Sequence, residues 1–118
     1  MRFTRVLASS SLVVLMMGIL PSTAFPNDAD GKNNARSKGK QLFARYCAGC
    51  HGPDGKGDGY KLLGPDPANL TRPAMKSKSD AALLSTIHEG KTNMPSWNVR
   101  LSDTDSRAVL AYVRTLAK

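Results

Sequence analysis

The sequence contains few cysteines, few aromatic residues and few acidic residues, and each of these low counts excludes a class of protein or partner. Only two cysteines occur in 118 residues, so the chain lacks the multi-bridge disulfide framework of small secreted domains. Aromatic residues make up 6% of the chain, too few for a surface built on base stacking, and nucleic acid is not an expected partner. Asp and Glu number 9 against 17 Lys and Arg, and the resulting net charge of +8 favours an acidic partner or surface.

A long membrane-spanning run is also missing. The longest apolar run, residues 6–20, has 15 residues, fewer than the roughly 20 that cross a bilayer as a helix. It follows the basic residues Arg2 and Arg5 and precedes a segment of small residues that ends at Ala24. This pattern predicts a secretory signal peptide over residues 1–24, cleaved after Ala24, and a retained membrane anchor is the alternative. Export places the mature chain outside the cytoplasm.

The rest of the chain has 94 residues and a net charge of +6, enough for one domain with a thin core. Residues 25–33 combine turn and charged residues without periodicity, and we expect them to form a mobile leader. Residues 34–118 are expected to form a single domain, in which no repeated segment is visible.

Three helical segments are predicted in this domain, and no alternating pattern indicates a strand, so the fold class is all-α. The first helix covers about residues 34–48 and places Phe43 and Tyr46 on one face, with Gly39 one turn earlier. Glycine inside a helix costs roughly 0.5 to 1 kcal/mol relative to alanine. We therefore expect Gly39 to let another helix approach closely.

The second and third helices carry clear end signals. The second covers about residues 80–89, with Ser79 as its N-cap and Gly90 as its stop. The third covers about residues 103–117, and Ser102 is its N-cap. The residues expected to face inward are Leu83, Leu84 and Ile87 on the second helix and Val109, Tyr112, Val113 and Leu116 on the third.

Residues 52–73 form a long segment of a different composition, with five glycines and four prolines. A structureless loop of that length is uncommon inside so small a domain. The segment is therefore expected to wrap around something rigid and apolar.

The segment Cys47-Ala48-Gly49-Cys50-His51 predicts a covalently bound cofactor, because Cys-x-x-Cys-His is the attachment signature of a c-type haem. On a helical turn the two thiols and the imidazole share one face, so Cys47 and Cys50 can bond the porphyrin vinyl groups while His51 reaches the iron. The alternatives are a redox dithiol and half of a zinc site. A redox dithiol usually follows a β-strand in a βαβ unit, and no strand is predicted here. A zinc site needs a fourth N or S ligand, and only His88 remains to supply it.

The second axial ligand is assigned by elimination and position. Met94 follows the second helix and precedes Pro95, which restricts the backbone, and we assign it as the ligand. Met75 is expected to fill space in the core, as methionine usually does. His88 is expected to be a surface histidine, because the inward positions of its helix are occupied by aliphatic residues.

Over residues 35–117 the chain resembles a class I, mono-haem, His/Met c-type cytochrome of the small bacterial periplasmic kind. The matching segments are residues 39–43, 47–51, 51–59, 93–97 and 110–113. The resemblance implies a fold of about three main helices with long loops wrapped around one covalent haem c. Its location would be periplasmic.

The resemblance also implies particular contacts. The terminal helices are expected to cross at nearly a right angle, with Gly39 and Phe43 against Val109, Leu110 and Tyr112. A proline carbonyl is expected to accept a hydrogen bond from the axial His51. The residues that can supply this carbonyl are Pro65 and Pro67, and the sequence leaves the choice open.

The predicted function is that of a soluble one-electron carrier rather than an enzyme, because His51 and Met94 close both axial positions. It would carry electrons between a quinol-oxidising complex or dehydrogenase and a terminal oxidase or reductase of a respiratory chain. Two alternatives are a haem-based gas sensor or ligand-binding protein and a membrane-anchored electron-transfer subunit of a larger redox complex.

The expected partners are redox proteins with acidic docking surfaces that bind transiently, and membrane contact is expected only through partner complexes. The lysines expected to surround the haem are Lys56, Lys61, Lys76, Lys78 and Lys91, whereas Lys118 is expected behind it. Calcium is not an expected ligand of residues 54–59, because Lys56 stands where a calcium loop needs an acid.

Overall fold

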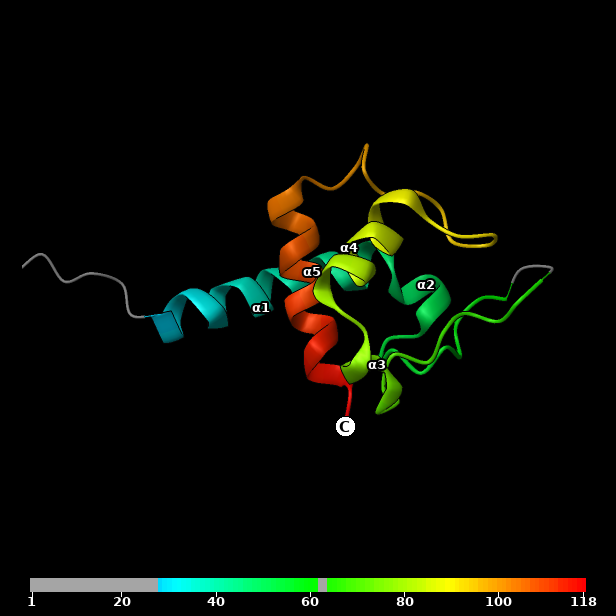
Figure 1. Ribbon diagram of the computed structural model, residues 1–118, viewed down its shortest axis with the longest axis horizontal. Coiled ribbons are helices and arrows are strands. Elements are labelled where there is room, and N and C mark those ends of the chain that lie inside the picture. The colour runs from blue at the N-terminus through cyan, green and yellow to red at the C-terminus, as the bar shows by residue number, and fades with distance from the viewer. Residues whose placement is uncertain (1–27, 62–63) are drawn as a thin grey trace, which may run out of the picture.

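The computed structural model describes residues 28–61 and 64–118, and within these ranges it contains helices and no strand (Figure 1). The helices are α1 (Asp28–Tyr46), α2 (Ala48–His51), α3 (Ala74–Ser77), α4 (Asp80–Glu89) and α5 (Asp103–Leu116). The predicted all-α fold class is confirmed. The three main predicted helices correspond to α1, α4 and α5, and two single-turn helices, α2 and α3, were not predicted as separate elements.

The helices α1 and α5 cross in direct contact, as Figure 1 shows. Gly39 is buried at this crossing, and a Cβ atom added there would overlap the backbone oxygen of Ala108 and lie 3.1 Å from Cβ of Tyr112. One turn further along α1, the ring centroid of Phe43 lies 5.3 Å from that of Tyr112. The expected contact of Gly39 and Phe43 with the last helix is confirmed, and the backbone of Ala108 is an added partner.

The first helix is longer than the sequence pattern predicts. It already includes Asp28, whereas the predicted start was Asn34. Residues 28–33, expected to belong to a leader, are helical and exposed. Two aspartates in the first turn, Asp28 and Asp30, interact favourably with the helix dipole. Glycine and asparagine at positions 31, 33 and 34 are weak helix formers, which explains why the pattern gave no sign of a helix here.

The predicted signal peptide, its cleavage point after Ala24 and the first residues of the leader lie outside the described residues. In the described ranges, no helix combines the length and the apolar character that crossing a membrane requires.

The capping signals of α4 and α5 are confirmed. The Ser79 hydroxyl accepts a hydrogen bond from the Ala82 amide at 3.2 Å, and the Ser102 hydroxyl accepts one from the Asp105 amide at the same distance. The boundaries of α4 are those predicted from the sequence, and α5 ends one residue earlier than predicted, at Leu116. Both helices therefore begin where a serine satisfies an otherwise unpaired amide.

The apolar core lies between α1, α5 and the connecting loops. Its buried cluster consists of Phe43, Leu70, Met75, Leu101, Val109 and Val113. Leu70 and Leu101 come from loops, where helical periodicity gives no indication of burial. The core therefore depends on loop residues as well as on the predicted stripe of α5.

An ion pair joins α1 to the first turn of α5 and leads to a test by pH. The Lys38 ammonium lies 2.6 Å from the Asp105 carboxylate, and together with the Ser102 hydroxyl it lowers the pKa of Asp105. A carboxyl group whose pKa is lowered on folding stabilises the protein above its unfolded pKa, and this contribution is lost as pH falls through the folded value.

We expect an Asp105→Asn variant to have a lower Tm than the wild type at pH 7, with the difference shrinking as pH falls below about 4. Thermal unfolding measured across a pH series tests this. The control is Asp30→Asn, which removes an exposed carboxylate from the projecting part of α1. The same Tm profile in both variants would contradict a specific role for Asp105.

Candidate functional site

The site is built on the tight turn that follows α1. The amides of Cys50 and His51 both donate to the carbonyl of Cys47, at 3.2 and 2.9 Å. The loop after α2 closes over this turn, with the Gly57 amide donating to the His51 carbonyl at 2.8 Å and the Tyr60 amide to the Gly49 carbonyl at 2.6 Å. The first part of the glycine-rich segment is therefore ordered around the Cys-x-x-Cys-His turn.

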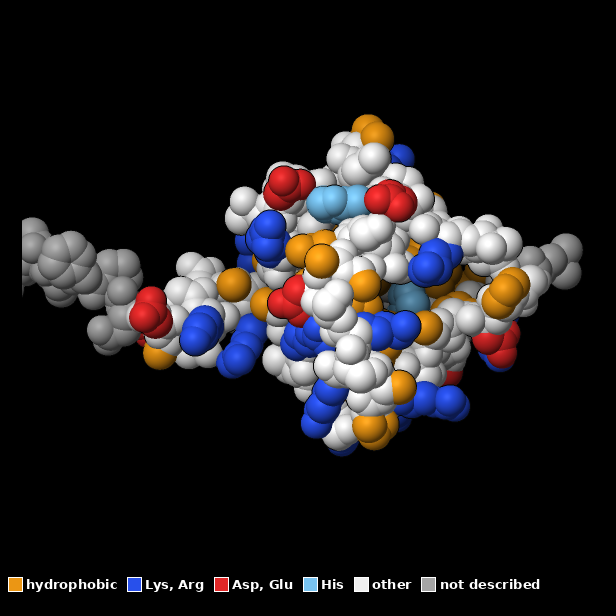
Figure 2. All heavy atoms as spheres, in the orientation of Figure 1, with side chains coloured by type: hydrophobic (Ala, Val, Ile, Leu, Met, Phe, Trp, Pro, Cys, Tyr) orange, Lys and Arg blue, Asp and Glu red, His pale blue; other side chains and the backbone are white. Residues whose placement is uncertain are grey.

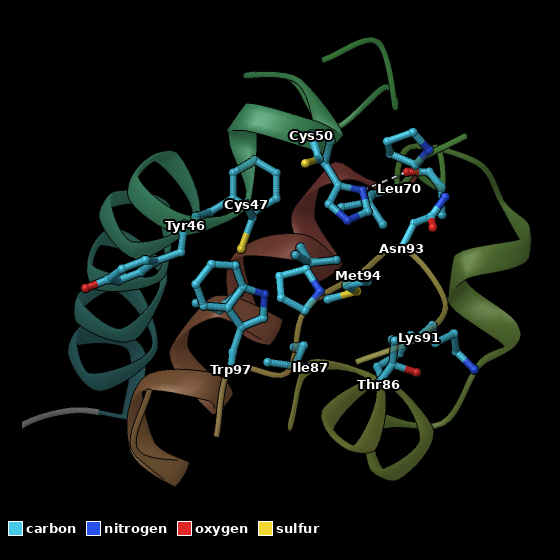
Figure 3. A pocket seen from close by; sticks show the side chains of 18 of the residues that line it. Tyr46, Cys47, Cys50, Leu70, Thr86, Ile87, Lys91, Asn93, Met94 and Trp97 are labelled. Atoms are coloured by element: carbon cyan, nitrogen blue, oxygen red, sulfur yellow. Dashed lines mark hydrogen bonds between the residues drawn. The ribbon is translucent and has the colours of Figure 1, made fainter. Parts of the chain in front are cut away.

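A cavity of about 600 Å³ opens beside this turn, and its walls are mainly apolar (Figure 3). All four predicted ligand residues line it: Cys47, Cys50, His51 and Met94. The other walls include Tyr46 and Phe43 of α1, Leu83 and Ile87 of α4, Val109 and Val113 of α5, and Leu70, Met75 and Trp97. Cavities of roughly 300 to 1,000 Å³ are typical of small-molecule and cofactor sites.

The imidazole of His51 is held in one orientation by a backbone carbonyl. Its Nδ1 lies 3.0 Å from the carbonyl oxygen of Ala68, the dashed line in Figure 3. Because a carbonyl only accepts, Nδ1 carries the proton and donates. In the neutral ring the other nitrogen, Nε2, is then the unprotonated one that can bind a metal ion.

The expectation that Pro65 or Pro67 supplies this carbonyl was wrong. The Pro67 oxygen is packed against Gly57, where an added Cβ would overlap it. The Pro65 oxygen faces the Asn93 side chain, whose Nδ2 lies 3.5 Å away. The carbonyl that reaches His51 belongs to Ala68, the residue after Pro67. The path of the folded loop determines which carbonyl lies close to His51, and the sequence does not show that path.

Met94 enters the cavity from a turn that is closed by two backbone hydrogen bonds. The Lys91 amide donates to the Met94 carbonyl at 2.9 Å, and the Met94 amide donates to the Lys91 carbonyl at 3.0 Å. Before the turn, Gly90 has a φ of +74°, and a Cβ there would overlap the Met94 oxygen. After it, the Trp97 amide donates to the Ile87 carbonyl at 3.1 Å. Figure 3 shows the Met94 side chain pointing into the cavity from this turn.

Met75 and His88 were the other two candidates for the second iron ligand, and they lie in different environments. Met75 is 8% exposed and belongs to the core, as expected, but it also lines the same cavity as Met94. His88, expected to be a surface histidine, is only partly exposed. Its ring is half-buried, and its Nε2 lies 2.9 Å from the hydroxyl of Ser106, which is completely buried on α5. Nothing local to His88 indicates this contact between helices.

The Cys47 thiol is poorly suited to redox dithiol chemistry. Burial, with a smaller effect of the nearby Cys50, raises the pKa of Cys47 to about 11. Since the thiolate is the reactive form of cysteine, a thiol that stays protonated at neutral pH is a weak nucleophile in exchange reactions. This property argues against the redox dithiol considered for this motif.

The expected cationic rim is only partly present at the cavity. Lys78 and Lys91 line it, but Lys56 and Lys61 line a separate hollow beyond Pro67 and Ala68. Lys61 also forms an ion pair with Asp66 at 2.9 Å, and Lys56 approaches Asp54 at 3.7 Å. Figure 2 shows Lys and Arg side chains spread around the hollowed centre of this face rather than gathered in one block.

Comparisons with known proteins identify the family to which the chain is similar. Residues 34–113 match the family described as cytochrome c oxidase, cbb3-type, subunit III. The chain is 41% identical over 90 residues to the cbb3-type cytochrome c oxidase subunit FixP of Azorhizobium caulinodans, covering 75% of this chain and 29% of FixP. It is 38% identical over 96 residues to subunit CcoP of Rhodobacter capsulatus, covering 66% of this chain and 28% of CcoP.

The chain thus spans less than a third of the length of these curated relatives. Among solved structures, it is similar to a chain of the Kuenenia stuttgartiensis reducing HAO-like protein complex. The TM-score is 0.58 with 27% sequence identity, and the similarity covers 68% of this chain and 41% of that chain.

Proposed function

Because the chain belongs to the cytochrome c oxidase, cbb3-type, subunit III family, whose matching region is a class I-type c-type cytochrome domain, we propose that it is a haem c electron-transfer subunit of a larger redox complex. The observation that carries the proposal is that Cys47, Cys50, His51 and Met94 line one mainly apolar cavity of about 600 Å³. These four residues come from two separate segments of the chain.

The donor set fits a covalent haem. Cys47 and Cys50 would form the thioether bonds, and His51 through Nε2 and Met94 through its sulfur would be the axial ligands. When bound, haem c supplies one-electron exchange at its iron. The Ala68 carbonyl fixes the proton on His51 Nδ1. The mainly apolar walls would limit the access of water to a bound haem, and the Met94 thioether, a soft donor, would favour its reduced state.

The comparisons favour a subunit of a complex over the free carrier predicted first. The relatives named above are oxidase subunits, and the similar solved chain belongs to a complex. The relatives that the comparisons name are oxidase subunits, and they give no support to the other alternative, a gas sensor. The proposed location is the periplasm, with the domain beginning near residue 34 and the export signal at residues 1–24.

The proposal is tested on the wild-type protein expressed in a host that attaches haem c. We expect one haem per chain that stays with the polypeptide after denaturation, as read from its alkaline pyridine spectrum and intact mass. The folded protein should be oxidised and reduced reversibly by one electron. A chain that folds without haem, or releases it on denaturation, would overturn the proposal. The same mass measurement on exported protein shows whether residues 1–24 are removed.

The lysines at the cavity lead to a prediction about partners. Lys91 lines the cavity, whereas Lys61 is paired with Asp66. We expect electron transfer to an acidic redox protein to slow as salt rises, because attraction is screened over about 10 Å at 0.1 M ionic strength. Lys91→Gln should lower the second-order rate constant at low salt more than Lys61→Gln.

Stopped-flow measurements over a salt series test this, with Lys118→Gln as a control that makes the same change in net charge. Equal losses for all three variants would mean that only the net charge attracts the partner. A rate constant independent of salt would mean that docking depends on apolar contacts.

A further inference from the structure

The cavity has an aromatic wall at the end where α1 stops. Tyr46 and Trp97 both line it, with ring centroids 5.5 Å apart and an interplanar angle of 52°. The guanidinium carbon of the exposed Arg45 lies 5.2 Å from the centre of the Tyr46 ring. Figure 3 shows Trp97 pointing into the cavity, while the Tyr46 hydroxyl points away from it. The two rings thus form a continuous contact from the cavity outward to an arginine on the surface.

The lysine end of the cavity lies elsewhere. Lys91 and Asn93 also line the cavity, and Figure 3 shows them at the opposite side from Tyr46. The Asn93 side chain faces the Pro65 carbonyl across this end, at 3.5 Å. The walls of the cavity therefore include a lysine at one end and, at the other end, a tilted pair of aromatic rings beside an arginine.

We propose that Trp97 and Tyr46 form a second electron-transfer route, which leads out of the cavity to the surface of the molecule at Arg45. This inference rests on the proposed function. With haem c bound, one electron would leave the haem along this route and would be taken up by an oxidised redox protein, so one electron is lost and one is gained. No bond forms or breaks, and no proton moves.

Physical reasons favour this route. Electron tunnelling weakens steeply with distance, and it is more efficient through packed π-systems than across a gap. Tilted aromatic pairs at this separation attract each other, and the guanidinium over Tyr46 adds a cation–π attraction, so the rings are held in contact. Trp, Tyr and Arg are also the residues that most often dominate binding at protein interfaces.

Two routes have a functional consequence for a subunit of a complex. A free carrier must dissociate from its donor before it meets its acceptor, so a single docking surface is sufficient. A subunit that relays electrons can bind both partners at once only if they dock on different surfaces. Lys91 and Tyr46 lie at opposite sides of the cavity, so electrons that leave by the two routes would reach different parts of the surface.

The test uses the haem-loaded protein with a photoactive ruthenium complex bound to a histidine introduced on the surface. In one variant Arg45→His places the label at the aromatic end, and in the matched variant Lys91→His places it at the lysine end. Isomers labelled at His88 or elsewhere are removed by chromatography and identified by peptide mass. After a laser flash, the rate of electron transfer between label and haem is unimolecular and does not depend on docking.

Tyr46→Leu is then introduced into each of the two labelled variants. In a second, separate pair of labelled variants, Tyr46 is replaced by phenylalanine, which keeps the ring. At the Arg45→His label we expect Tyr46→Leu to lower the rate about tenfold more than it does at the Lys91→His label. Tyr46→Phe should retain most of the rate at both labels. The reduction potential of each variant is measured, so that a change in driving force is separated from a change in coupling.

An equal loss of rate at both labels would overturn the route, because Tyr46 would then act only through the shape of the cavity. No loss at the Arg45→His label would overturn it as well. Failure of the proposed function is distinguishable, since the parent protein would then show no covalent haem before any label is attached.

Discussion

Replacing Gly39 by valine is expected to destabilise the protein by about 3 kcal/mol, at the upper end of the range for adding bulk to a packed interior. A Cβ at this position would overlap the Ala108 carbonyl oxygen, which is backbone and cannot rotate away, and it would come within 3.1 Å of Tyr112 Cβ. The helices would have to separate, which would also weaken the Phe43–Tyr112 ring contact. Urea unfolding followed by circular dichroism measures the loss.

The control is Lys40→Val, which places the same β-branched side chain at an exposed position of the same helix. Valine costs less than about 1 kcal/mol in helix propensity, so the control should lose only a small part of the stability lost by Gly39→Val. Similar losses in the two variants would mean that propensity rather than the crossing of α1 and α5 explains the effect.

The parts of the fold that could be predicted from the sequence are those with local causes. The ends of α4 and α5 follow from serine side chains that cap amides three residues later, and Gly90 ends α4 with a φ of +74°. The spacing within residues 47–51 places two cysteines and a histidine on one turn, so the cavity wall they form was predictable. Each signal lies within a few residues of the feature it determines.

The parts that could not be predicted depend on segments brought together by folding. The hydrogen bond from His51 joins residues 17 positions apart, and it goes to Ala68 because the carbonyls of Pro65 and Pro67 face other groups. His88 is partly buried because its ring contacts the hydroxyl of Ser106 on another helix. In the sequence it stands next to the charged Glu89, which favours a surface position. No periodicity or composition carries this information.

The choice of Met94 rather than Met75 as the iron ligand could be predicted from the sequence only in part. Pro95 and the position after α4 favour Met94 from the sequence alone, and the paired hydrogen bonds with Lys91 show how its backbone is held. Met75 lines the same cavity, and its carbonyl is held by Arg114 at 2.6 Å. Both methionines are therefore anchored, and the ligand is decided by substituting each in turn.

Replacing Met94 by alanine is expected to change the electronic properties of the haem site strongly while leaving the haem attached. Cys47 and Cys50 should still hold the haem, but the sixth position would open. The potential should fall by on the order of 0.1 V, given that axial ligands set haem potentials over about 0.8 V. Imidazole and carbon monoxide should then bind to the variant, whereas we expect the wild type, with both ligand positions filled, not to bind them.

Optical titration with imidazole and a redox titration of Met94→Ala measure these changes, and Met75→Ala is the matched control from the same cavity. Met75→Ala should lose stability, because it removes a buried side chain, while keeping the far-red absorption band of a thioether on oxidised iron. If that band survives in Met94→Ala and disappears in Met75→Ala, the axial ligand is Met75. The Lys91–Met94 turn would then serve only to close the cavity.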